Sequence, residues 1–373
     1  METVIEVSQH ELLTKLKTIG RISQPKNTAY PAAGWFRFRR HPQWDDALSV
    51  TATDMTGEMS AKVKCEKIEN NVDFCIDSRV LLEILPQIPD QPLKLTVNPD
   101  KRLSVEYWTG SFEIPLHDEN LFPEISMNLT DNMPLYMKTE IIATGFKQVI
   151  DFTGKDEVRP VMTSVLMDIK KDEVTFVASS GHVLSKQVFE YSAEVEQQLI
   201  IPNNAAKLIL SMIDPEVEEA NIEITKKNFM IEIGDFTMVY LLTEGKYPNY
   251  RSVIPAHKWT AKVDRQVLLG AIRRTSVFSP DGSGMIAMYF IGDKLRITSK
   301  DMDYNQSGEE SIPVSYDGES FQIGFNSKQL ILLLSSVSDK HCEIRLTTPG
   351  QAATIIPEET AGVTLLIMPM IIE

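Results

Sequence analysis

Side chains that could support catalysis are few in this sequence and form no recognised arrangement. Gly181-His182 lies in a polar turn between two strand-like runs. The sequence shows no carboxylate or nucleophile that would act as a catalytic partner of this histidine. The one notable glycine cluster, Phe278–Gly284, contains Pro-Asp-Gly, which is foremost a turn sequence. Phosphate-binding loops ending in Lys-Ser/Thr, Gly-x-Ser-x-Gly and His-Glu-x-x-His do not occur. We therefore predict a non-catalytic protein with no catalytic residues.

Metal sites and disulfides are not indicated either. The three cysteines, Cys65, Cys75 and Cys342, lie far apart and none belongs to a Cys-x-x-Cys pair. The six histidines are equally scattered. We expect no metal and no cofactor.

Composition is that of an ordinary globular protein. The 373 residues are 43% hydrophobic and 24% charged, which allows two or three domains. No apolar run approaches the roughly 18 residues of a membrane helix, and the N-terminus lacks the features of a signal peptide, so we expect a cytoplasmic protein without membrane contact. The net charge of −15 argues against nucleic-acid binding unless cations gather locally.

One pattern, a short apolar strand followed by a polar cap and an apolar helix, occurs three times. Ile201 lies 125 residues after Ile76 and 122 residues before Ile323, and the three isoleucines hold equivalent places in the pattern. The period is close to one third of the chain, and each third is long enough to bury its own core. The repeat predicts three similar domains.

Other features repeat with the same period. Each third opens with a helix candidate, and these candidates span residues 8–22, 139–152 and 264–278. Turn-rich stretches that predict linkers end the first two thirds, at residues 122–134 and 247–255. We predict an α+β fold in which each domain packs two helices on mostly antiparallel sheets, with domains at residues 1–127, 128–254 and 255–373.

Local patterns add two expectations. Ser8 and Glu11 have the spacing of a capping box at the start of the first helix. In residues 34–40 aromatic and basic residues alternate, so a strand would turn Phe36 and Phe38 to the core and Arg37 and Arg39 to the other side. Aromatics interleaved with arginines can also bind single strands. We favour the plain strand, followed by a hairpin loop at residues 41–46.

The candidate helices carry cations although the chain is acidic. If equivalent helices of several repeats line one surface, these cations would form a positive lining inside a negative body. Arg265 and Arg274 are also candidates for that lining. The alternative is a set of ordinary solvated helix faces. The hypothesised DNA-facing residues are Lys17, Arg21, Lys26, Arg79, Lys147, Lys207, Arg273 and Lys328.

Four motifs, in order along the chain, resemble one known family. These are Glu157–Pro160, Ala178–Leu184, Tyr247–Pro255 and Leu366–Met370. Together with the triple repeat they resemble the bacterial sliding clamp, the beta subunit of DNA polymerase III. The resemblance implies a homodimeric ring that closes head to tail around double-stranded DNA. It also implies a processivity factor that tethers the replicative polymerase and meets the clamp loader and other clamp-binding proteins.

A ring of that kind answers the objection from charge. A closed ring leaves DNA only by opening or by sliding off an end, so weak contacts to phosphates suffice. Such contacts carry no sequence information.

The resemblance also implies a partner site and a ring contact. Clamp-binding proteins of the family insert a short apolar peptide between the second and third domains. Carried over to this chain, that pocket comprises Met162, Ser179, Gly181, His182, Leu184, Pro248, Val253, Asn326, Leu366, Met368, Pro369 and Met370. Edge strands at residues 110–116 and 304–310 are implied to form the ring contact. Its expected residues are Phe112, Ile114, Glu309 and Glu310, with the glutamates facing Lys101 or Arg102.

The chain departs from the family pattern in three places. Ser180–Val183 replaces the usual Asp-Gly-His-Arg, Met370–Glu373 lacks the usual basic residue, and Tyr30–Gly34 lacks the usual Pro-Ile-Leu. Loss of these cations predicts weaker binding of acidic peptides. The chain is then a divergent second clamp or a clamp of an unusual lineage. Two other classes stay open: a ligand-binding or enzymatic protein with its site at His182, and a clamp-fold scaffold without a DNA role.

Overall fold

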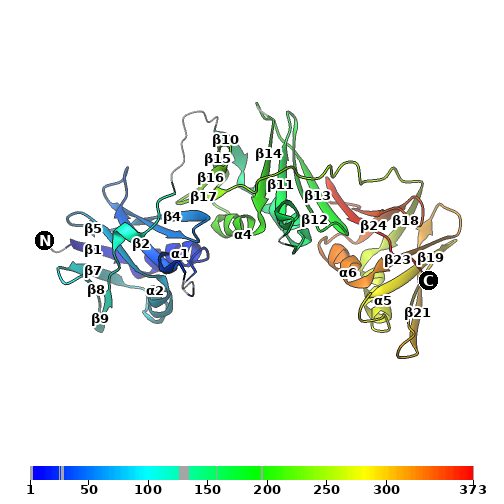
Figure 1. Ribbon diagram of the computed structural model, residues 1–373, viewed down its shortest axis with the longest axis horizontal. Helices are drawn as coiled ribbons and strands as arrows, with labels where there is room; N and C mark the ends of the chain where they lie inside the picture. The colour runs from blue at the N-terminus through cyan, green and yellow to red at the C-terminus, as the bar shows by residue number, and fades with distance from the viewer. Residues whose placement is uncertain are drawn as a thin grey trace. The chain divides into compact units, whose positions relative to one another are not determined.

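The computed structural model describes residues 3–24, 26, 29–125, 134–156, 158–194 and 196–372 (Figure 1). Within these residues the fold is α+β, and all strand pairs are antiparallel. The predicted boundary at residues 127 and 128, and Glu157 of the first motif, lie outside the described residues. None of the described helices is long and apolar enough to cross a membrane.

The described residues form six α-helices, two in each third of the sequence, as the repeat predicted. They are α1 (Gln9–Ile19), α2 (Ser78–Ile84), α3 (Thr139–Val149), α4 (Asn203–Met212), α5 (Arg265–Ser276) and α6 (Ser327–Ser335). Five short 3-10 helices accompany them: η1 (Pro31–Gly34), η2 (Leu85–Gln87), η3 (Glu119–Leu121), η4 (Ile150–Phe152) and η5 (Pro160–Thr163). The pairs α1 with α2 and α5 with α6 lie in contact (Figure 1).

The chain forms two compact units. The first comprises the residues up to Ile142 together with Lys207–Leu242, and the second comprises Ala143–Ala206 with the residues from Thr243 onward. The contacts do not separate at each third, because two of the four sheets join strands from successive thirds. The division into three domains therefore stays a prediction.

The first unit contains two sheets. The five-stranded sheet has the order β5 (Lys67–Ile68), β1 (Thr3–Ser8), β7 (Pro92–Asn98), β8 (Arg102–Tyr107), β9 (Gly110–Pro115). The eight-stranded sheet has the order β10 (Leu135–Lys138), β15 (Glu219–Ile224), β16 (Asn228–Ile233), β17 (Phe236–Leu241), β4 (Gly57–Lys64), β3 (Ala47–Thr53), β2 (Trp35–Arg40), β6 (Asp73–Asp77). In it β17 of the central third pairs with β4 of the first, with Met238 opposite Met59.

The second unit contains the other two sheets. The nine-stranded sheet has the order β14 (Gln197–Pro202), β11 (Ser164–Ile169), β12 (Glu173–Ser179), β13 (Val183–Glu190), β26 (Val363–Ile367), β25 (Ala353–Pro357), β24 (His341–Leu346), β18 (Trp259–Asp264), β22 (Ser315–Tyr316). The four-stranded sheet has the order β21 (Gln306–Pro313), β20 (Lys294–Asp301), β19 (Met285–Ile291), β23 (Phe321–Asn326). In the larger sheet β13 of the central third pairs with β26 of the last.

Side chains at strand ends start the helices. Ser8, the last residue of β1, accepts a hydrogen bond from the Glu11 backbone amide at 3.5 Å, which confirms one half of the predicted capping box. Asp264 ends β18 and accepts from the Val267 amide at 3.0 Å. Such caps satisfy backbone donors that have no partner inside the helix. The repeated strand, cap and helix of the sequence is present as β6 with α2, β14 with α4 and β23 with α6. In two of these units the cap is a side chain that accepts from a backbone amide: Asp77 from Arg79 at 2.9 Å and Asn326 from Gln329 at 3.0 Å.

The alternating stretch at residues 34–40 forms strand β2, as predicted, with Phe36 and Phe38 in the core. Arg37 alternates with these two residues and lies on the opposite face of the strand, as predicted, but its side chain is buried there as well. The Arg37 guanidinium makes two hydrogen bonds of 2.9 Å to the Asp73 carboxylate. Glu124 accepts a further bond at 3.1 Å. The bidentate carboxylate partner compensates for the burial of this guanidinium.

The prediction that Arg265 belongs to an exposed cationic lining is wrong. Arg265 is 6% exposed and donates hydrogen bonds to the backbone carbonyls of Asp339 (2.6 Å) and Leu334 (3.0 Å). A third bond reaches the Ser338 carbonyl at 3.3 Å. These carbonyls lie at and after the end of α6, so this arginine ties the start of α5 to the end of α6.

Replacing Arg265 with methionine should lower the free energy of unfolding by about 3 kcal/mol, because buried carbonyl oxygens lose their donors. Arg273→Met on the exposed face of the same helix is the matched control and should change it by less than about 0.5 kcal/mol. Urea denaturation followed by circular dichroism measures both. Equal effects of the two substitutions would contradict a structural role for Arg265.

Candidate functional site

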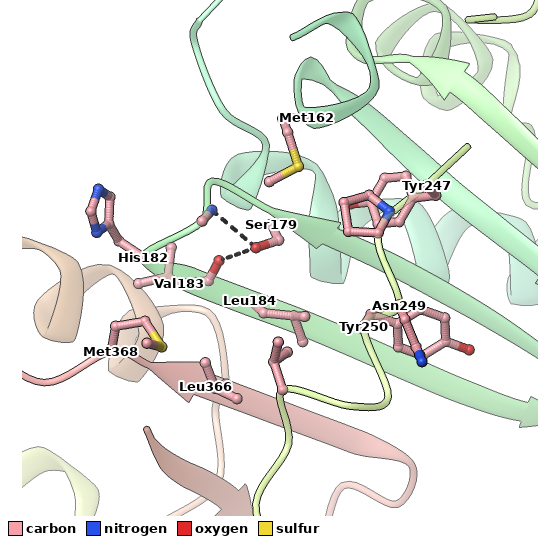
Figure 2. A pocket seen from close by; sticks show the side chains of 13 residues that line it. Met162, Ser179, His182, Val183, Leu184, Tyr247, Asn249, Tyr250, Leu366 and Met368 are labelled. Atoms are coloured by element: carbon pink, nitrogen blue, oxygen red, sulfur yellow. Dashed lines mark hydrogen bonds between the residues drawn. The ribbon is translucent and has the colours of Figure 1, made fainter. Parts of the chain in front are cut away.

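A cavity of about 180 Å³ lies in the second unit, above the place where β13 pairs with β26 (Figure 2). Leu184 and Leu366 are register partners across that pairing, and both line the cavity. Each is 2% exposed and belongs to a buried apolar cluster. The described residues that line it are Met162, Ser179, Gly181, His182, Val183, Leu184, Tyr247, Pro248, Asn249, Tyr250, Val253, Leu366 and Met368.

One wall of the cavity is the segment between β17 and β18, which the sequence analysis predicted as a linker. We call residues 243–258 the connecting segment. It has neither helix nor strand, yet Tyr247 and Tyr250 are each only 6% exposed and pack in the buried cluster below the cavity. Burial raises the pKa of the Tyr247 phenol. The segment therefore forms part of the folded core, and it also joins the central third of the chain to the last third.

The opposite side of the cavity is the turn between β12 and β13. The Ser179 hydroxyl donates to the Val183 carbonyl at 2.9 Å and accepts from the Gly181 amide at 3.1 Å. Gly181 has a φ of +91°, a backbone conformation that favours glycine. The His182 carbonyl accepts a bond of 2.8 Å from the Met368 amide, which joins this turn to the chain after β26. The predicted polar turn at Gly181-His182 is confirmed.

Within the described part of the chain, none of the residues that line the cavity is an aspartate, glutamate, lysine or arginine. The His182 side chain is exposed and points away from the Ser179 hydroxyl in Figure 2. Methionines stand at two sides of the cavity, Met162 and Met368, and their flexible thioethers adapt to different shapes. The cavity suits uncharged apolar groups held by a few polar contacts.

The structure brings nine of the twelve predicted pocket residues together around this cavity. Asn326, Pro369 and Met370 are not among its lining. Asn326 instead caps α6 by accepting from the Gln329 amide at 3.0 Å. The Met370 amide donates to the Gly324 carbonyl at 2.8 Å, so Met370 lies beside β23, at a second hollow.

Four lining residues were not predicted: Val183, Tyr247, Asn249 and Tyr250. All four lie inside motifs that the sequence analysis recognised, Ala178–Leu184 and Tyr247–Pro255. Position within those motifs was the available signal. Val183, where the family pattern has arginine, is 4% exposed and places a neutral side chain in the lining.

All eight residues of the hypothesised DNA-facing set are exposed. Lys17, Lys147 and Arg273 occupy the last turns of α1, α3 and α5, so the cation recurs at a similar place in each repeat. Cations in the last turn also stabilise a helix through its dipole. Exposure and recurrence are compatible with both roles. Arg274, by contrast, is paired with the Glu310 carboxylate at 2.6 Å.

The two strands expected at the ring contact are both sheet edges. β9 is the last strand of the five-stranded sheet, and β21 is the last strand of the four-stranded sheet. On β9, Ile114 is 4% exposed and Phe112 is half-buried. Glu309 is exposed on β21. Within this chain Glu310 already pairs with Arg274, and Arg102 pairs with Glu113 at 2.9 Å.

Among the described residues no group of three or more histidine, cysteine, aspartate or glutamate side chains could hold a metal ion. Cys65, Cys75 and Cys342 are free and buried. Burial raises the pKa of each thiol to about 12, so the reactive thiolate is scarce at neutral pH.

Comparison with known proteins agrees with the geometry. Two family models match: the central domain of the DNA polymerase III beta subunit over residues 137–249, and its C-terminal domain over residues 251–371. The beta sliding clamp of Pseudomonas putida is 24% identical over 333 residues, which cover 87% of this chain and 88% of that protein. The beta sliding clamp of Vibrio cholerae is 22% identical, over 87% and 89% of the two chains.

Solved structures show the same fold. The DNA polymerase III subunit beta of Pseudomonas aeruginosa bound to griselimycin superposes with a TM-score of 0.93, at 20% identity and with 100% of both chains covered. The beta subunit from Thermotoga maritima gives a TM-score of 0.91, at 21% identity and the same coverage. Because the two family models together match more than half of its residues, the chain belongs to the DNA polymerase III beta subunit family.

Proposed function

We propose that this chain is a non-catalytic DNA sliding clamp. Two copies close head to tail into a ring around duplex DNA, and the ring tethers the replicative polymerase and other clamp-binding proteins. The observation that carries the proposal is the apolar cavity over the β13–β26 pairing, in a chain that belongs to the beta subunit family. A protein with this role works on chromosomal DNA in the bacterial cytoplasm. No described feature favours a catalytic site at His182.

Ring closure would use the free edges of β9 and β21. An edge strand presents unpaired backbone donors and acceptors, which a strand of a second copy can complete. Large apolar side chains lie at the turns beside both edges: Trp108 is 76% exposed, Met302 73% and Tyr304 70%. Aromatic residues and methionine are enriched at protein interfaces. This supports an interface made of two pairing edges, in which the first third of one copy meets the last third of the other.

The encircled DNA would meet the exposed cations of the helices. Contacts from long lysine and arginine side chains to phosphates are weak, independent of sequence and lost in salt, and such contacts permit sliding. The remainder of the chain is acidic and repels DNA from other surfaces.

Charge reversal tests the DNA-facing set. Replacing Lys17, Lys147 and Arg273 with glutamate should lower affinity for a short linear duplex at low salt by at least about 10-fold, because three phosphate contacts per chain are lost. Because a ring of two chains loses six such contacts, the dependence of log K on log salt should become shallower by about 5. Fluorescence anisotropy with a labelled duplex measures both quantities.

The matched control reverses three exposed lysines in turns between strands, Lys171, Lys226 and Lys227. It changes the net charge by the same amount and should leave the salt dependence unchanged. If both triple variants weaken binding equally, net charge alone governs the affinity and the proposed DNA-facing set is wrong.

A charge placed in the cavity tests the partner site. Val253 lines the cavity and is 49% exposed, so Val253→Asp should not impair folding. It should weaken binding of a fluorescein-labelled peptide from the host replicative polymerase by at least about 10-fold, because an apolar anchor would bury a carboxylate. Val158, which is 87% exposed and outside the lining, provides the control Val158→Asp. Unchanged affinity of the Val253 variant would exclude this cavity as the docking site.

A further inference from the structure

The connecting segment forms a wall of the cavity although its backbone is poorly anchored. Among the described residues, its backbone is tied to neighbouring parts of the unit only near its ends. The Thr243 amide donates to the Ile200 carbonyl, the Lys258 amide donates to the Leu346 carbonyl, and the Ala256 carbonyl accepts from the Thr347 hydroxyl at 3.0 Å. Between these ends lies a turn closed by the Ser252 amide and the Asn249 carbonyl. Backbone pairing therefore does not explain how the middle of the wall keeps its place, so side chains must do so.

Tyr250 is one side chain that does so through a specific polar contact. Its hydroxyl donates a 2.8 Å hydrogen bond to Oδ2 of Asp168 on β11. The other carboxylate oxygen of Asp168 accepts a 3.0 Å hydrogen bond from the side-chain amide of Gln198 on β14. Asp168 is only 2% exposed, so each of its oxygens depends on a partner within the protein.

Arg251 completes the arrangement from outside. Its guanidinium donates to the Tyr250 hydroxyl oxygen at 3.1 Å and to the Glu173 carboxylate at 2.9 Å, and it approaches Asp168 to 3.6 Å. The guanidinium also lies over the Tyr250 ring, 5.6 Å from its centre. Lys186 lies near these side chains. Its pKa is lowered, chiefly by burial and secondly by the positive charge of Arg251. We name Asp168, Gln198, Glu173, Tyr250 and Arg251 the Asp168 cluster.

We infer that Asp168 and Arg251 are positioning residues for the peptide pocket: through Tyr250 they hold the connecting segment in the conformation that forms the cavity wall. Neither residue lines the cavity, whereas Tyr250 does (Figure 2). The inference rests on the proposed function of the cavity as a peptide site. If the wall were released, only a fraction of molecules would hold a formed pocket, and the apparent affinity would fall by that fraction.

The Tyr250→Phe variant tests the hydroxyl without changing the packing of the ring. It leaves a buried carboxylate oxygen without its donor, which favours conformations that expose Asp168 to water. Affinity for the labelled polymerase peptide should fall about 10-fold. The loss should lie in the association rate, with the dissociation rate within about twofold of the parent protein, because the formed pocket is unchanged once it exists.

Rescue separates positioning from direct contact with the peptide. In Tyr250→Phe combined with Asp168→Asn, the buried charge that lost its donor becomes a neutral amide of the same size. The double variant should recover to within about threefold of the parent affinity. Tyr289→Phe, on β19 outside the cavity, removes a tyrosine hydroxyl elsewhere in the unit and should have no effect.

Hydrogen–deuterium exchange of the peptide-free protein gives a readout that does not depend on binding. Backbone amides of residues 244–257 should exchange at least about 10-fold faster in Tyr250→Phe and should return toward the parent rate in the double variant. If Tyr250→Phe fails to fold, Arg251→Gln replaces it, because the Arg251 side chain is 55% exposed. A smaller change of about threefold in the same direction is then expected.

The outcomes distinguish this inference from the proposed function. If the parent protein does not bind the peptide, the proposed function fails and the inference fails with it. If the parent binds and Tyr250→Phe keeps both its association rate and its exchange rates, only the positioning role is wrong. Faster dissociation with unchanged exchange would also overturn it, since the hydroxyl would then act by touching the peptide.

Discussion

The antiparallel pairing of β13 with β26 is the contact on which the cavity depends. It joins strands that the chain places far apart, with Leu184 opposite Leu366, and it makes one nine-stranded sheet from the central and last thirds of the sequence. The same two leucines are the floor of the cavity. A floor built on a sheet is formed before any ligand arrives, which lowers the ordering cost of binding.

The walls of the cavity show a second constraint, the burial of polar groups. Asp168 lies beneath the connecting segment with almost no exposure, and its partners come from β14 and from the segment itself. A buried carboxylate gives little net stability but strongly disfavours any conformation that removes its partners. That property suits a segment whose backbone lacks ladder bonds, because a specific polar contact defines one position where apolar packing alone would allow several.

Local signals in the sequence were enough to predict the helices, and non-local pairing explains what they missed. A cap residue such as Ser8 or Asp264 and the helix that follows it are determined within a few residues, so the repeated strand, cap and helix could be read directly. The continuity of sheets across thirds could not, because register between distant strands such as β17 and β4 leaves no mark in either strand alone. The burial of Arg37 and Arg265 could not be predicted either, because their carboxylate and carbonyl partners are distant in sequence.

The residues of the candidate site were likewise predictable where the signal was local and not where it depended on distant parts of the chain. Motif resemblance identified most of the lining, but the turn-forming composition of residues 247–255 concealed that Tyr247 and Tyr250 belong to the core. Sequence patterns report turn residues well, whereas the burial of two tyrosines depends on the sheet beneath them. The neutral Val183 in the lining is in keeping with a preference for uncharged partner segments, which stays a prediction.

Native mass measured by light scattering tests the central claim of a closed homodimeric ring most directly. One chain has a mass of 42.1 kDa. A closed ring of two chains predicts a single species of about twice that mass, in keeping with two edge strands that each find a partner in the second copy. A species with the mass of one chain at every accessible concentration would contradict the ring, and with it the proposal that this chain encircles DNA as a dimer.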